Sequence, residues 1–313
     1  MIQDITPHKL RNEYDPGERP VPGSRIFVFR ENKEGRGDRE ILVKLDKEKM
    51  TLDYPKFSEI ESKESYKKLT DDELVYLFSV DDDNFFLVDP AKEDALSKDE
   101  SIEEALGREL ADQYSFVPFR ELRNAYYNPK EYIYAAFTAY QLAEWYKVTR
   151  FCGKCGTVNV NDSKERARTC PRCGNKIYPR INPAVIIGVT DKESDRIILT
   201  KYRVGYGHNA LVAGFTEIGE TLEETVAREV MEEVGLTVSN IRYYKSQPWG
   251  IASDILVGFY CDATGDKAIR MDEGELKYAE WVKREDIVLQ PLEYSLTNEM
   301  MKLFKEKGYD GTK

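Results

Sequence analysis

The pattern of apolar and polar positions divides the chain into three stretches, which differ in the spacing at which apolar residues recur. Before about residue 120, short apolar and β-branched runs alternate with charged, turn-forming segments, which predicts strands joined by loops. Apolar residues recur at helical spacing between Ala135 and Tyr146, which predicts a packing helix. From Asn182 onward strands and helices alternate, which favours an α/β domain with a mixed sheet covered by helices on both sides.

The N-terminal stretch contains four runs that we expect to be strands. They are residues 24–31, residues 40–45 and two runs within residues 72–91. An acidic tetrapeptide, Asp81 to Asn84, separates the last two runs and has two interpretations. It lacks the spaced ligands and terminal glutamate of an EF-hand, so the pattern favours a hairpin turn over a calcium loop.

The C-terminal stretch contains a short helix with clear ends. Thr221 followed by Glu224 is a capping box, and Gly235 is a natural helix stop. Strands are expected on both sides of this helix, and a second helix near the end of the chain. The expected strands are 183–190, 196–202, 241–249, 255–261 and 279–282, and the closing helix is 297–307.

The two sides of the short helix differ in chemistry. Its predicted buried side is formed by Val226, Val230 and Val234, extended by Ala227 and Met231. Glu229, Glu232 and Glu233 fall within an arc of about 100° on the other side. Carboxylates crowded on one surface repel one another, so solvent or cations must offset the cost. Such a cluster is often a solvated acidic face, but it also suits a hard divalent cation, above all Mg²⁺.

Length and charge limit the class of protein. The 313 residues are enough for two or three domains, and 41% apolar with 33% charged residues is typical of a globular protein. A net charge of −11 argues against non-specific nucleic-acid binding by the whole chain. The first residues lack the apolar core of a signal peptide, and no apolar run is long enough to span a bilayer. We therefore expect a cytoplasmic protein without a membrane partner.

Four of the five cysteines form two C-x-x-C pairs. Cys152 and Cys155 precede Cys170 and Cys173 at the spacing of a zinc ribbon. Two disulfides or a redox pair are the alternatives, but the two equivalent pairs favour Zn²⁺ bound by four thiolates. Four protein ligands leave no open position, so the expected zinc is structural. Cys261 is expected to be a small buried apolar residue.

The region around these cysteines is basic. Residues 147–180 contain nine lysines and arginines against Asp162 and Glu165, in a chain that is acidic as a whole. A positive module could bind a polyanion such as RNA. The alternative is a solvated surface that pairs with the acidic remainder, because zinc ribbons are often basic without binding RNA.

The acidic helix belongs to a longer pattern. Gly214, Glu220 and the run from Arg228 to Leu236 occupy the fixed positions of the Nudix box, so the chain resembles the Nudix hydrolases. That family hydrolyses nucleoside diphosphates linked to another group and has an α/β/α sandwich fold. The resemblance implies that Glu229, Glu232 and Glu233 hold the metals, that Glu220 supports them, and that Arg228 braces the acidic loop by ion pairing.

The order of the segments resembles one branch of this family. A zinc ribbon before the Nudix unit, a separate domain before that, and Ser246-Gln247-Pro248-Trp249 after the box are similar to the NADH pyrophosphatases. The implied domains are an α+β N-terminal domain at 1–147, a zinc ribbon at 148–180 and a Nudix domain at 181–313. The implied activity is cleavage of NAD(H) to nicotinamide mononucleotide and AMP with Mg²⁺ or Mn²⁺. Some members remove NAD caps from RNA, and members are typically homodimers.

The same resemblance implies which residues meet the substrate. Phe215 and Tyr178 match aromatic residues of the nicotinamide pocket, and Gln247 and Trp249 belong to the motif after the box. Glu275 matches a glutamate that approaches the metals. For Phe215, which directly follows the first glycine of the box, burial in the core is an alternative to stacking on a base.

One segment departs from the family pattern. Gly250 to Asp254 replaces the usual Pro-Phe-Pro-x-Ser, so an acid stands where a serine is expected. A carboxylate near phosphate or ribose would alter the choice of substrate, which leaves ADP-ribose, diadenosine polyphosphates and FAD as alternatives. A Nudix-derived binding module without catalysis is the other alternative, although none of the metal carboxylates is missing.

Overall fold

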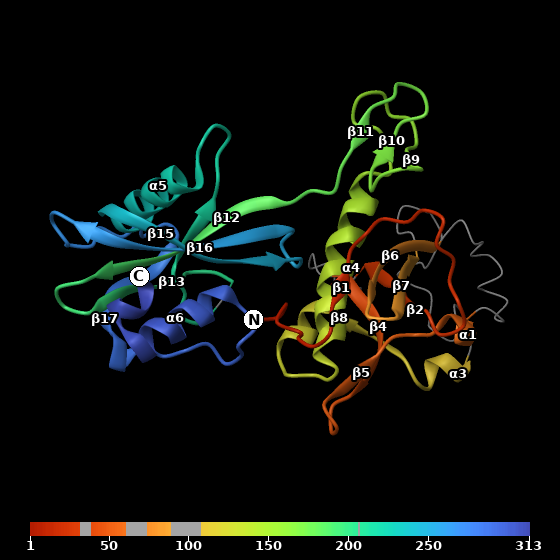
Figure 1. Ribbon diagram of the computed structural model, residues 1–313, viewed down its shortest axis with the longest axis horizontal. Coiled ribbons are helices and arrows are strands. Elements are labelled where there is room, and N and C mark those ends of the chain that lie inside the picture. The colour runs from red at the N-terminus through yellow and green to blue at the C-terminus, as the bar shows by residue number, and fades with distance from the viewer. Residues whose placement is uncertain (32–38, 61–73, 89–107, 206) are drawn as a thin grey trace. The chain divides into compact units, whose positions relative to one another are not determined.

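The computed structural model describes residues 1–31, 39–60, 74–88, 108–205 and 207–313. They form two compact units. The N-terminal unit consists of Asp4–Arg180 with Gly250–Ala252, and the C-terminal unit consists of Met1–Gln3, Ile181–Trp249 and Ser253–Lys313 (Figure 1). The predicted boundary between residues 147 and 148 lies inside the N-terminal unit and stays a prediction. Most of the charged stretch expected between the first two strands lies outside the described residues.

The N-terminal unit is α+β. One sheet has the order β1 (Leu10–Arg11), β6 (Leu74–Val80), β7 (Asp83–Val88) and β2 (Arg25–Phe27). The other contains β3 (Phe29–Glu31), β4 (Arg39–Asp46) and β5 (Thr51–Asp53), with β8 (Ser115–Pro118) paired to β4. The run expected at 24–31 is therefore two strands, interrupted at Val28, because its halves join different sheets.

The hairpin between β6 and β7 is confirmed. The two strands are antiparallel, and Asp81 at the turn has φ = 52°, a left-handed conformation that aspartate tolerates. Asp81 accepts hydrogen bonds from the backbone N–H of Lys9 at 2.9 Å, and it pairs with His8 at 2.8 Å. The hydroxyl of Tyr132 donates to Asp83 at 2.8 Å. These carboxylates have partners within the fold, which agrees with a turn rather than a calcium loop.

Helices complete the N-terminal unit. The short ones are α1 (Phe57–Ile60), α3 (Arg108–Ala111) and the 3₁₀ helix η3 (Phe119–Arg123). The long helix α4 spans Lys130–Val148 and confirms the predicted packing helix, since Ala135, Ala139 and Tyr146 are buried. After α4 the chain forms a small three-stranded sheet of β9 (Val160–Asn161), β10 (Arg168–Thr169) and β11 (Lys176–Ile177). Among the helices that the structure describes, none is long and apolar enough to span a membrane.

A six-stranded mixed sheet forms the centre of the C-terminal unit. Its strands are β12 (Asn182–Asp191), β13 (Arg196–Tyr202), β14 (Val212–Phe215), β15 (Thr237–Trp249), β16 (Asp254–Thr264) and β17 (Leu276–Lys283). Their order is β15-β16-β12-β13-β17, and β14 pairs with the first half of β12. The β12–β16 pair is parallel and the others are antiparallel. The predicted mixed sheet is confirmed.

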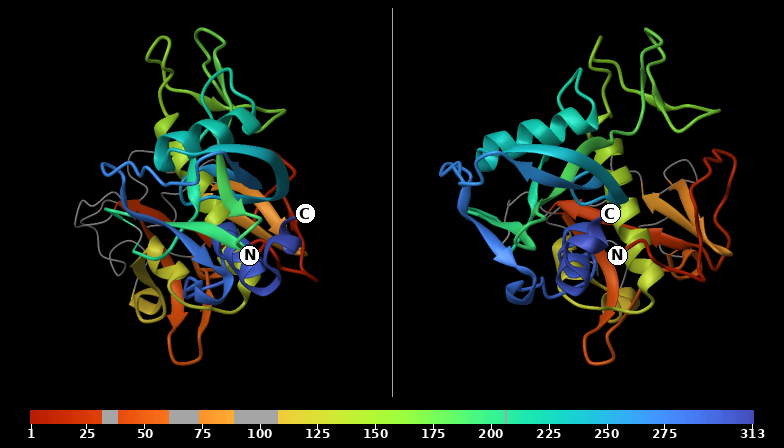
Figure 2. Two further views of the ribbon diagram at one scale, coloured as in Figure 1. Left: turned by 90° about the vertical axis from the view of Figure 1, so that its left-hand side faces the viewer. Right: turned by 60° about the vertical axis from the view of Figure 1, so that its left-hand side comes forward.

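Two helices cover opposite faces of this sheet. Alternation along β12 sends Val185 and Ile187 into one apolar cluster with the valines of α5 (Leu222–Val234). Ile186 enters a second cluster with Met300 of α6 (Leu296–Lys307). Figures 1 and 2 show α5 and α6 on either side of the strands. The short 3₁₀ helices η4 (Arg284–Asp286) and η5 (Tyr309–Thr312) flank α6 in the sequence. The predicted three-layer α/β/α arrangement is thus confirmed.

The ends of α5 agree with the sequence, but one edge of its buried side does not. The Thr221 side chain accepts from the backbone N–H of Glu224 in a complete capping box, and Gly235 ends the helix at φ = 69°. The expectation that Ala227 and Met231 extend the buried side is wrong, because both are exposed. The buried side of the helix instead extends in the opposite direction around the helix axis and includes Glu233, because β14 packs against that edge of the helix.

Candidate functional site

The site is built where α5 packs against β14. Glu233, on the last turn of α5, is 2% exposed, and its Oε1 accepts a hydrogen bond from the backbone N–H of Ala213 at 3.3 Å. Its other carboxylate oxygen, Oε2, is buried and has no hydrogen-bond partner among the described residues. Gly214, the next residue of β14, has no side chain at the point where the Glu229 carboxylate approaches. The strand and the helix therefore enclose two carboxylates of the box.

Burial changes the acidity of these two groups. Burial, with a smaller contribution from the nearby carboxylates of Glu275 and Glu229, raises the pKa of Glu233 to about 8 against the hydrogen bond from Ala213, which lowers it. Burial also raises the pKa of Glu229, and repulsion from Glu232 and Glu275 acts in the same direction, while Arg228 opposes the shift. Negative charge is thus concentrated at the site without full compensation from the protein.

Arg228 connects the acidic loop to the helix. Its Nε and Nη2 donate to the two oxygens of Glu220 at 2.6 and 2.9 Å, and its Nη1 donates to Glu229 at 2.7 Å and Glu232 at 3.0 Å. Nη2 also donates to the backbone carbonyl of Phe215 at 2.9 Å. The pairing with Arg228 lowers the pKa of Glu220 to about 2. This network fixes the loop before α5 to the helix itself.

A divalent cation fits this arrangement. Glu233 has an unpartnered Oε2, and the pKa of Glu229 stays raised even though Arg228 pairs with it, so the positive charge near these two carboxylates is incomplete. Oxygen ligands of this kind are those that Mg²⁺ and Mn²⁺ prefer. Glu232 is 60% exposed and turns toward Arg228, so Glu229 and Glu233 are the more enclosed members of the predicted trio.

Glu275 is exposed just before β17. Its backbone carbonyl accepts from the N–H of Arg203 at 3.1 Å, and the N–H of Asp272 bonds to the backbone carbonyl of Glu233 at 2.9 Å. The segment before β17 is therefore tied both to the end of β13 and to the last turn of α5. This connection places the Glu275 carboxylate close enough to raise the pKa of Glu233.

The proposed substrate residues differ in exposure. Phe215 ends β14 and is 55% exposed, so its alternative interpretation as a core residue is wrong. Tyr178 lies in the N-terminal unit, is 54% exposed, and donates from its hydroxyl to Glu165 at 3.1 Å. Trp249 is partly buried against the α6 cluster. The ring faces of Phe215 and Tyr178 are therefore open to solvent in their respective units.

Gln247 is placed inside the fold. Its side chain is completely buried, and its Nε2 donates to the Gln3 side chain at 2.9 Å and to the Tyr294 carbonyl at 2.8 Å. Its Oε1 accepts from the backbone N–H of Leu296 at 2.7 Å. These bonds use both amide hydrogens, so the structure contradicts direct substrate binding by Gln247 and gives it a role in holding the start of α6. Residue type alone does not distinguish a buried glutamine from an exposed one, so the burial of Gln247 could not be predicted from the sequence.

The segment that departs from the family pattern turns between β15 and β16. Asp254 is 6% exposed, and Asn182 donates to its carboxylate at 3.3 Å. Ser253 has φ = 63°, a left-handed turn conformation, and its carbonyl accepts from the N–H of Asn182 at 2.9 Å. The carboxylate at this position thus bonds to a neighbouring strand within its own unit.

The four cysteines meet as the spacing predicted. Their Sγ atoms all lie within 4.8 Å of one another, and the measured Sγ–Sγ distances are 3.5, 3.6 and 3.7 Å. Thiolates at about 2.3 Å from a tetrahedral Zn²⁺ lie about 3.8 Å apart, so the cluster fits zinc and is too open for disulfides. Gly156 and Gly174 take φ = 72° and 71° in the two matching turns. Cys261 is buried, as expected.

The basic residues around the cysteines are partly used within the fold. Arg166 donates to the carbonyl of Leu77 at 2.6 Å, buried Arg168 donates to the carbonyl of Asn159 at 3.0 Å, and Lys176 pairs with Asp162 at 2.9 Å. Lys154, Lys164 and Arg172 are exposed. The surface charge is therefore smaller than the sequence count suggested.

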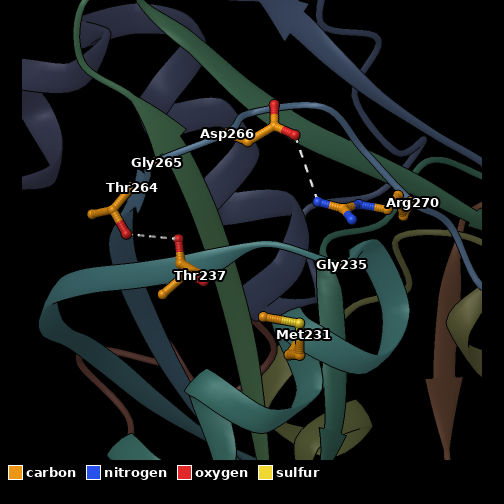
Figure 3. A pocket seen from close by; sticks show the side chains of 7 residues that line it. All are labelled: Met231, Gly235, Thr237, Thr264, Gly265, Asp266 and Arg270. Carbon is orange, nitrogen blue, oxygen red and sulfur yellow. Dashed lines mark hydrogen bonds and ion pairs between the residues drawn. The ribbon is translucent and has the colours of Figure 1, made fainter.

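A hollow of about 550 Å³ lies beside the C-terminal end of α5. Figure 3 shows its lining, which comes from the end of α5, the start of β15 and the segment after β16. Its lining residues are Met231, Gly235, Thr237, Thr264, Gly265, Asp266 and Arg270. Asp266 and Arg270 pair with each other at 3.5 Å, and both are largely exposed. None of the lining residues is a carboxylate of the box.

Two groups at the site were not expected from the sequence. One is the backbone N–H of Ala213, which no side-chain pattern reveals. The other is Tyr202 at the end of β13, whose pKa is raised by burial and by the carboxylates of the site. An aromatic residue at a strand end gives no local signal of this position, because the neighbours come from distant segments.

Two protein-family models match parts of this chain. A family model described as "NUDIX domain" matches residues 180–304, and one described as "NADH pyrophosphatase zinc ribbon domain" matches residues 149–178. A solved structure titled "Crystal structure of NUDIX hydrolase from Nitrosomonas europaea" has 23% sequence identity and a TM-score of 0.43, and the match covers 52% of this chain and 94% of that one.

Two curated relatives carry the same name, "NAD-capped RNA hydrolase NudC". The protein from Klebsiella pneumoniae subsp. pneumoniae is 41% identical over 152 residues, and the protein from Enterobacter sp. is 42% identical over 153 residues. Each match covers 48% of this chain and 58% of the relative, so the chain spans little more than half the length of these relatives. From its described geometry and these matches, the chain contains a Nudix domain, preceded in the sequence by an NADH pyrophosphatase zinc ribbon domain.

Proposed function

We propose that this chain hydrolyses the pyrophosphate bond of NAD(H) and releases nicotinamide mononucleotide and AMP. The observation that carries the proposal is the buried carboxylate of Glu233, held on one oxygen by Ala213 and unpartnered on the other. The names of the curated relatives support the choice of an NAD-containing substrate. Cleavage adds one water across the P–O–P bridge, so each product carries one phosphate.

In this proposal Glu229, Glu232 and Glu233 would hold Mg²⁺ or Mn²⁺. When bound, the metal would neutralise phosphate oxygens and favour ionisation of the attacking water. Glu233, or Glu275 from the segment before β17, would accept the proton of that water during in-line attack on phosphorus. Arg228 would keep Glu220 and the loop before α5 in place, because its guanidinium donates hydrogen bonds to Glu220, to Glu229 and to the backbone carbonyl of Phe215.

Phe215 would stack on a base of the dinucleotide, and Trp249 would support it within the same unit. Tyr178 stays in the proposal as a further stacking residue. The exposure of both rings is compatible with stacking, which is worth roughly 1–3 kcal/mol per base. Asp254 is buried and bonded to Asn182, so it does not supply the free carboxylate that would favour ADP-ribose, diadenosine polyphosphates or FAD over NAD(H).

An NAD-capped RNA is a second candidate substrate, because it contains the same pyrophosphate bond. The relatives' names and the exposed lysines and arginine of the ribbon, Lys154, Lys164 and Arg172, favour it. Zn²⁺ at the four cysteines would be structural. A reducing, cytoplasmic compartment suits the free thiols.

A homodimer is also part of the proposal. Phe151, Val158 and Val160 expose half of their apolar side chains on the ribbon, as surfaces that bind a partner often do. Light scattering should give twice the 36.2 kDa of one chain. A mass of one chain at micromolar concentration would contradict the dimer.

The experiment for the activity is a substrate panel. Purified protein is incubated with NADH, NAD⁺, ADP-ribose, a diadenosine polyphosphate, FAD and an NAD-capped RNA, with Mg²⁺, Mn²⁺ or a chelator. We expect nicotinamide mononucleotide and AMP from NAD(H), and no turnover with chelator. A wide preference for another dinucleotide would overturn the substrate, and no hydrolysis of any compound would overturn the activity.

A further inference from the structure

Tyr202 ends the row of β13 side chains that faces α5. Alternation along the strand puts Ile198, Thr200 and Tyr202 on one side, and Ile198 belongs to the apolar cluster that contains the valines of α5. The Tyr202 ring packs against this same cluster. Ile198 and Thr200 are fully buried, whereas Tyr202 is only partly buried. The ring is therefore packed against the core while part of the residue remains exposed.

An irregularity in the pairing of β13 with β17 lies beside Tyr202, at the segment that carries Glu275. Lys201 pairs with Tyr278, but Tyr202 pairs with Leu276, so Lys277 is an extra residue in β17. A bulge of this kind redirects the neighbouring side chains, and bulges are common beside functional sites. Here it brings Leu276 into the apolar cluster with Tyr202, and the N–H of Arg203 bonds to the carbonyl of Glu275 at 3.1 Å. Tyr202 and Glu275 are thus held next to each other.

The surroundings of the Tyr202 hydroxyl are acidic. Burial raises its pKa, and the carboxylates of Glu233, Glu275 and Glu229 raise it further, so the group keeps its proton at neutral pH. Within the described residues, no hydrogen bond holds this hydroxyl. Buried tyrosine hydroxyls usually find a partner. The neighbouring carboxylates repel phosphate, but the neutral hydroxyl can donate a hydrogen bond. A phosphate oxygen of a bound substrate is a suitable acceptor for it.

We propose that Tyr202 is a substrate-binding residue whose hydroxyl donates a hydrogen bond to a non-bridging oxygen of the substrate's pyrophosphate. This inference rests on the proposed function of the site. The absence of charge is a reason for a tyrosine at this position. Its hydroxyl can donate to phosphate and leaves the carboxylates charged, whereas a lysine or arginine would neutralise them. A hydrogen bond to a charged group contributes more than one between neutral groups.

The test is Tyr202→Phe, which keeps the ring packing and removes only the hydroxyl. Titration calorimetry with adenosine 5′-(α,β-methylene)diphosphate, a pyrophosphate analogue that cannot be cleaved, should show affinity lowered about 10-fold or more. The KM for the best substrate should rise similarly, with a smaller change in kcat and an unchanged melting temperature. Tyr243→Phe is the control, because Tyr243 is an exposed tyrosine on β15 and should change none of these values.

Each other outcome contradicts the inference in a distinct way. Unchanged analogue affinity in Tyr202→Phe, in an enzyme that still cleaves dinucleotides, overturns the inference and leaves the proposed function intact. A fall in kcat with unchanged KM would mean that the hydroxyl positions the carboxylates and does not bind the substrate. A lowered melting temperature would mean that the hydroxyl stabilises the fold. A wild-type protein that neither cleaves the panel nor binds the analogue overturns both proposals.

Discussion

Gly214 and Glu229 are in such close contact that any side chain at position 214 would displace the Glu229 carboxylate. A Cβ atom on Gly214 would lie 2.0 Å from the carboxyl carbon of Glu229 and 2.1 Å from its Oε1. A shift of Glu229 would disturb its ion pair with Arg228, which donates to the same Oε1 at 2.7 Å. The glycine is therefore required by close approach between a strand and a helix, and not by a left-handed backbone conformation.

We expect Gly214→Ala to reduce turnover on the order of 100-fold, because the added methyl group would displace the carboxylate of Glu229, a proposed metal ligand, by about an ångström. Circular dichroism should remain close to that of the wild type. Gly207→Ala is the matched control, since a Cβ there meets nothing within 4 Å, and it should keep full activity. Wild-type kinetics in Gly214→Ala would show that the carboxylate of Glu229 has no fixed place in the reaction.

Glu233→Gln tests the buried carboxylate. The amide keeps the shape and can still accept the hydrogen bond from Ala213, but it loses charge and basicity. We expect turnover to fall on the order of 100-fold or more, as for other general bases. The variant no longer buries a carboxylate charge, which is unfavourable, so its melting temperature without metal should not fall below that of the wild type. Undiminished turnover would exclude Glu233 as base and essential ligand.

Local signals in the sequence predicted the helices well. The capping box at Thr221 and the stop at Gly235 involve neighbouring residues, and both appear as expected. The apolar, β-branched run at 183–190 likewise predicted a strand, and β12 contains it. The burial of Glu233 in place of Met231 was not predictable in this way, because it depends on where β14 packs against the helix.

The same limit applies to the candidate site. The spacing of the four cysteines was enough to predict that they meet, since each pair forms its own tight turn. Gln247 has no such local signature, and its burial follows from contacts with Gln3, Tyr294 and Leu296, far away in the sequence. Tyr202 was overlooked for the same reason: its neighbours come from α5 and from the segment before β17.

Removal of a cysteine tests the zinc site. We expect wild-type protein purified without added metal to contain one zinc per chain, and Cys170→Ser to contain much less and to melt at a lower temperature, because structural zinc contributes directly to folding. Cys261→Ala removes a buried thiol outside the cluster and should keep its zinc. Little zinc in the wild type, with a normal melting curve for Cys170→Ser, would contradict the assignment.

Phe215→Ala tests stacking in the nucleotide pocket. Phe215 is 55% exposed, so truncation should leave the melting temperature nearly unchanged while the KM for NADH rises about 10-fold. Ile218→Ala is a suitable control, because this nearby side chain is fully exposed and lies in the loop that follows β14. Equal kinetics for Phe215→Ala and the wild type would mean that the base is held elsewhere.

The last prediction concerns Asp191, a buried carboxylate at the end of β12. It is 3% exposed and accepts hydrogen bonds from Lys267 at 2.6 Å and Arg196 at 3.1 Å, and from the Ser194 hydroxyl. Burial alone would raise the pKa of Asp191, but the hydrogen bonds from Lys267, Ser194 and Arg196 outweigh it and lower the pKa. The carboxylate therefore stabilises the fold in its charged form.

Asp191→Asn should lower the stability of the C-terminal unit by about 1–3 kcal/mol at pH 7, the usual cost of leaving buried polar groups poorly paired. A depressed pKa contributes stability that is present above the unfolded value, about 3.9, and is lost as the pH falls through the folded value. Urea unfolding at pH 7, 5 and 3.5 should therefore show a gap between wild type and variant that is constant at the two higher values and begins to narrow at the lowest. Asp310→Asn, at an exposed ion pair with Lys313, should change stability by less than about 0.5 kcal/mol throughout. A gap for Asp191→Asn that widened toward low pH would mean that the protonated acid, and not the ion pairs, stabilises this end of the strand.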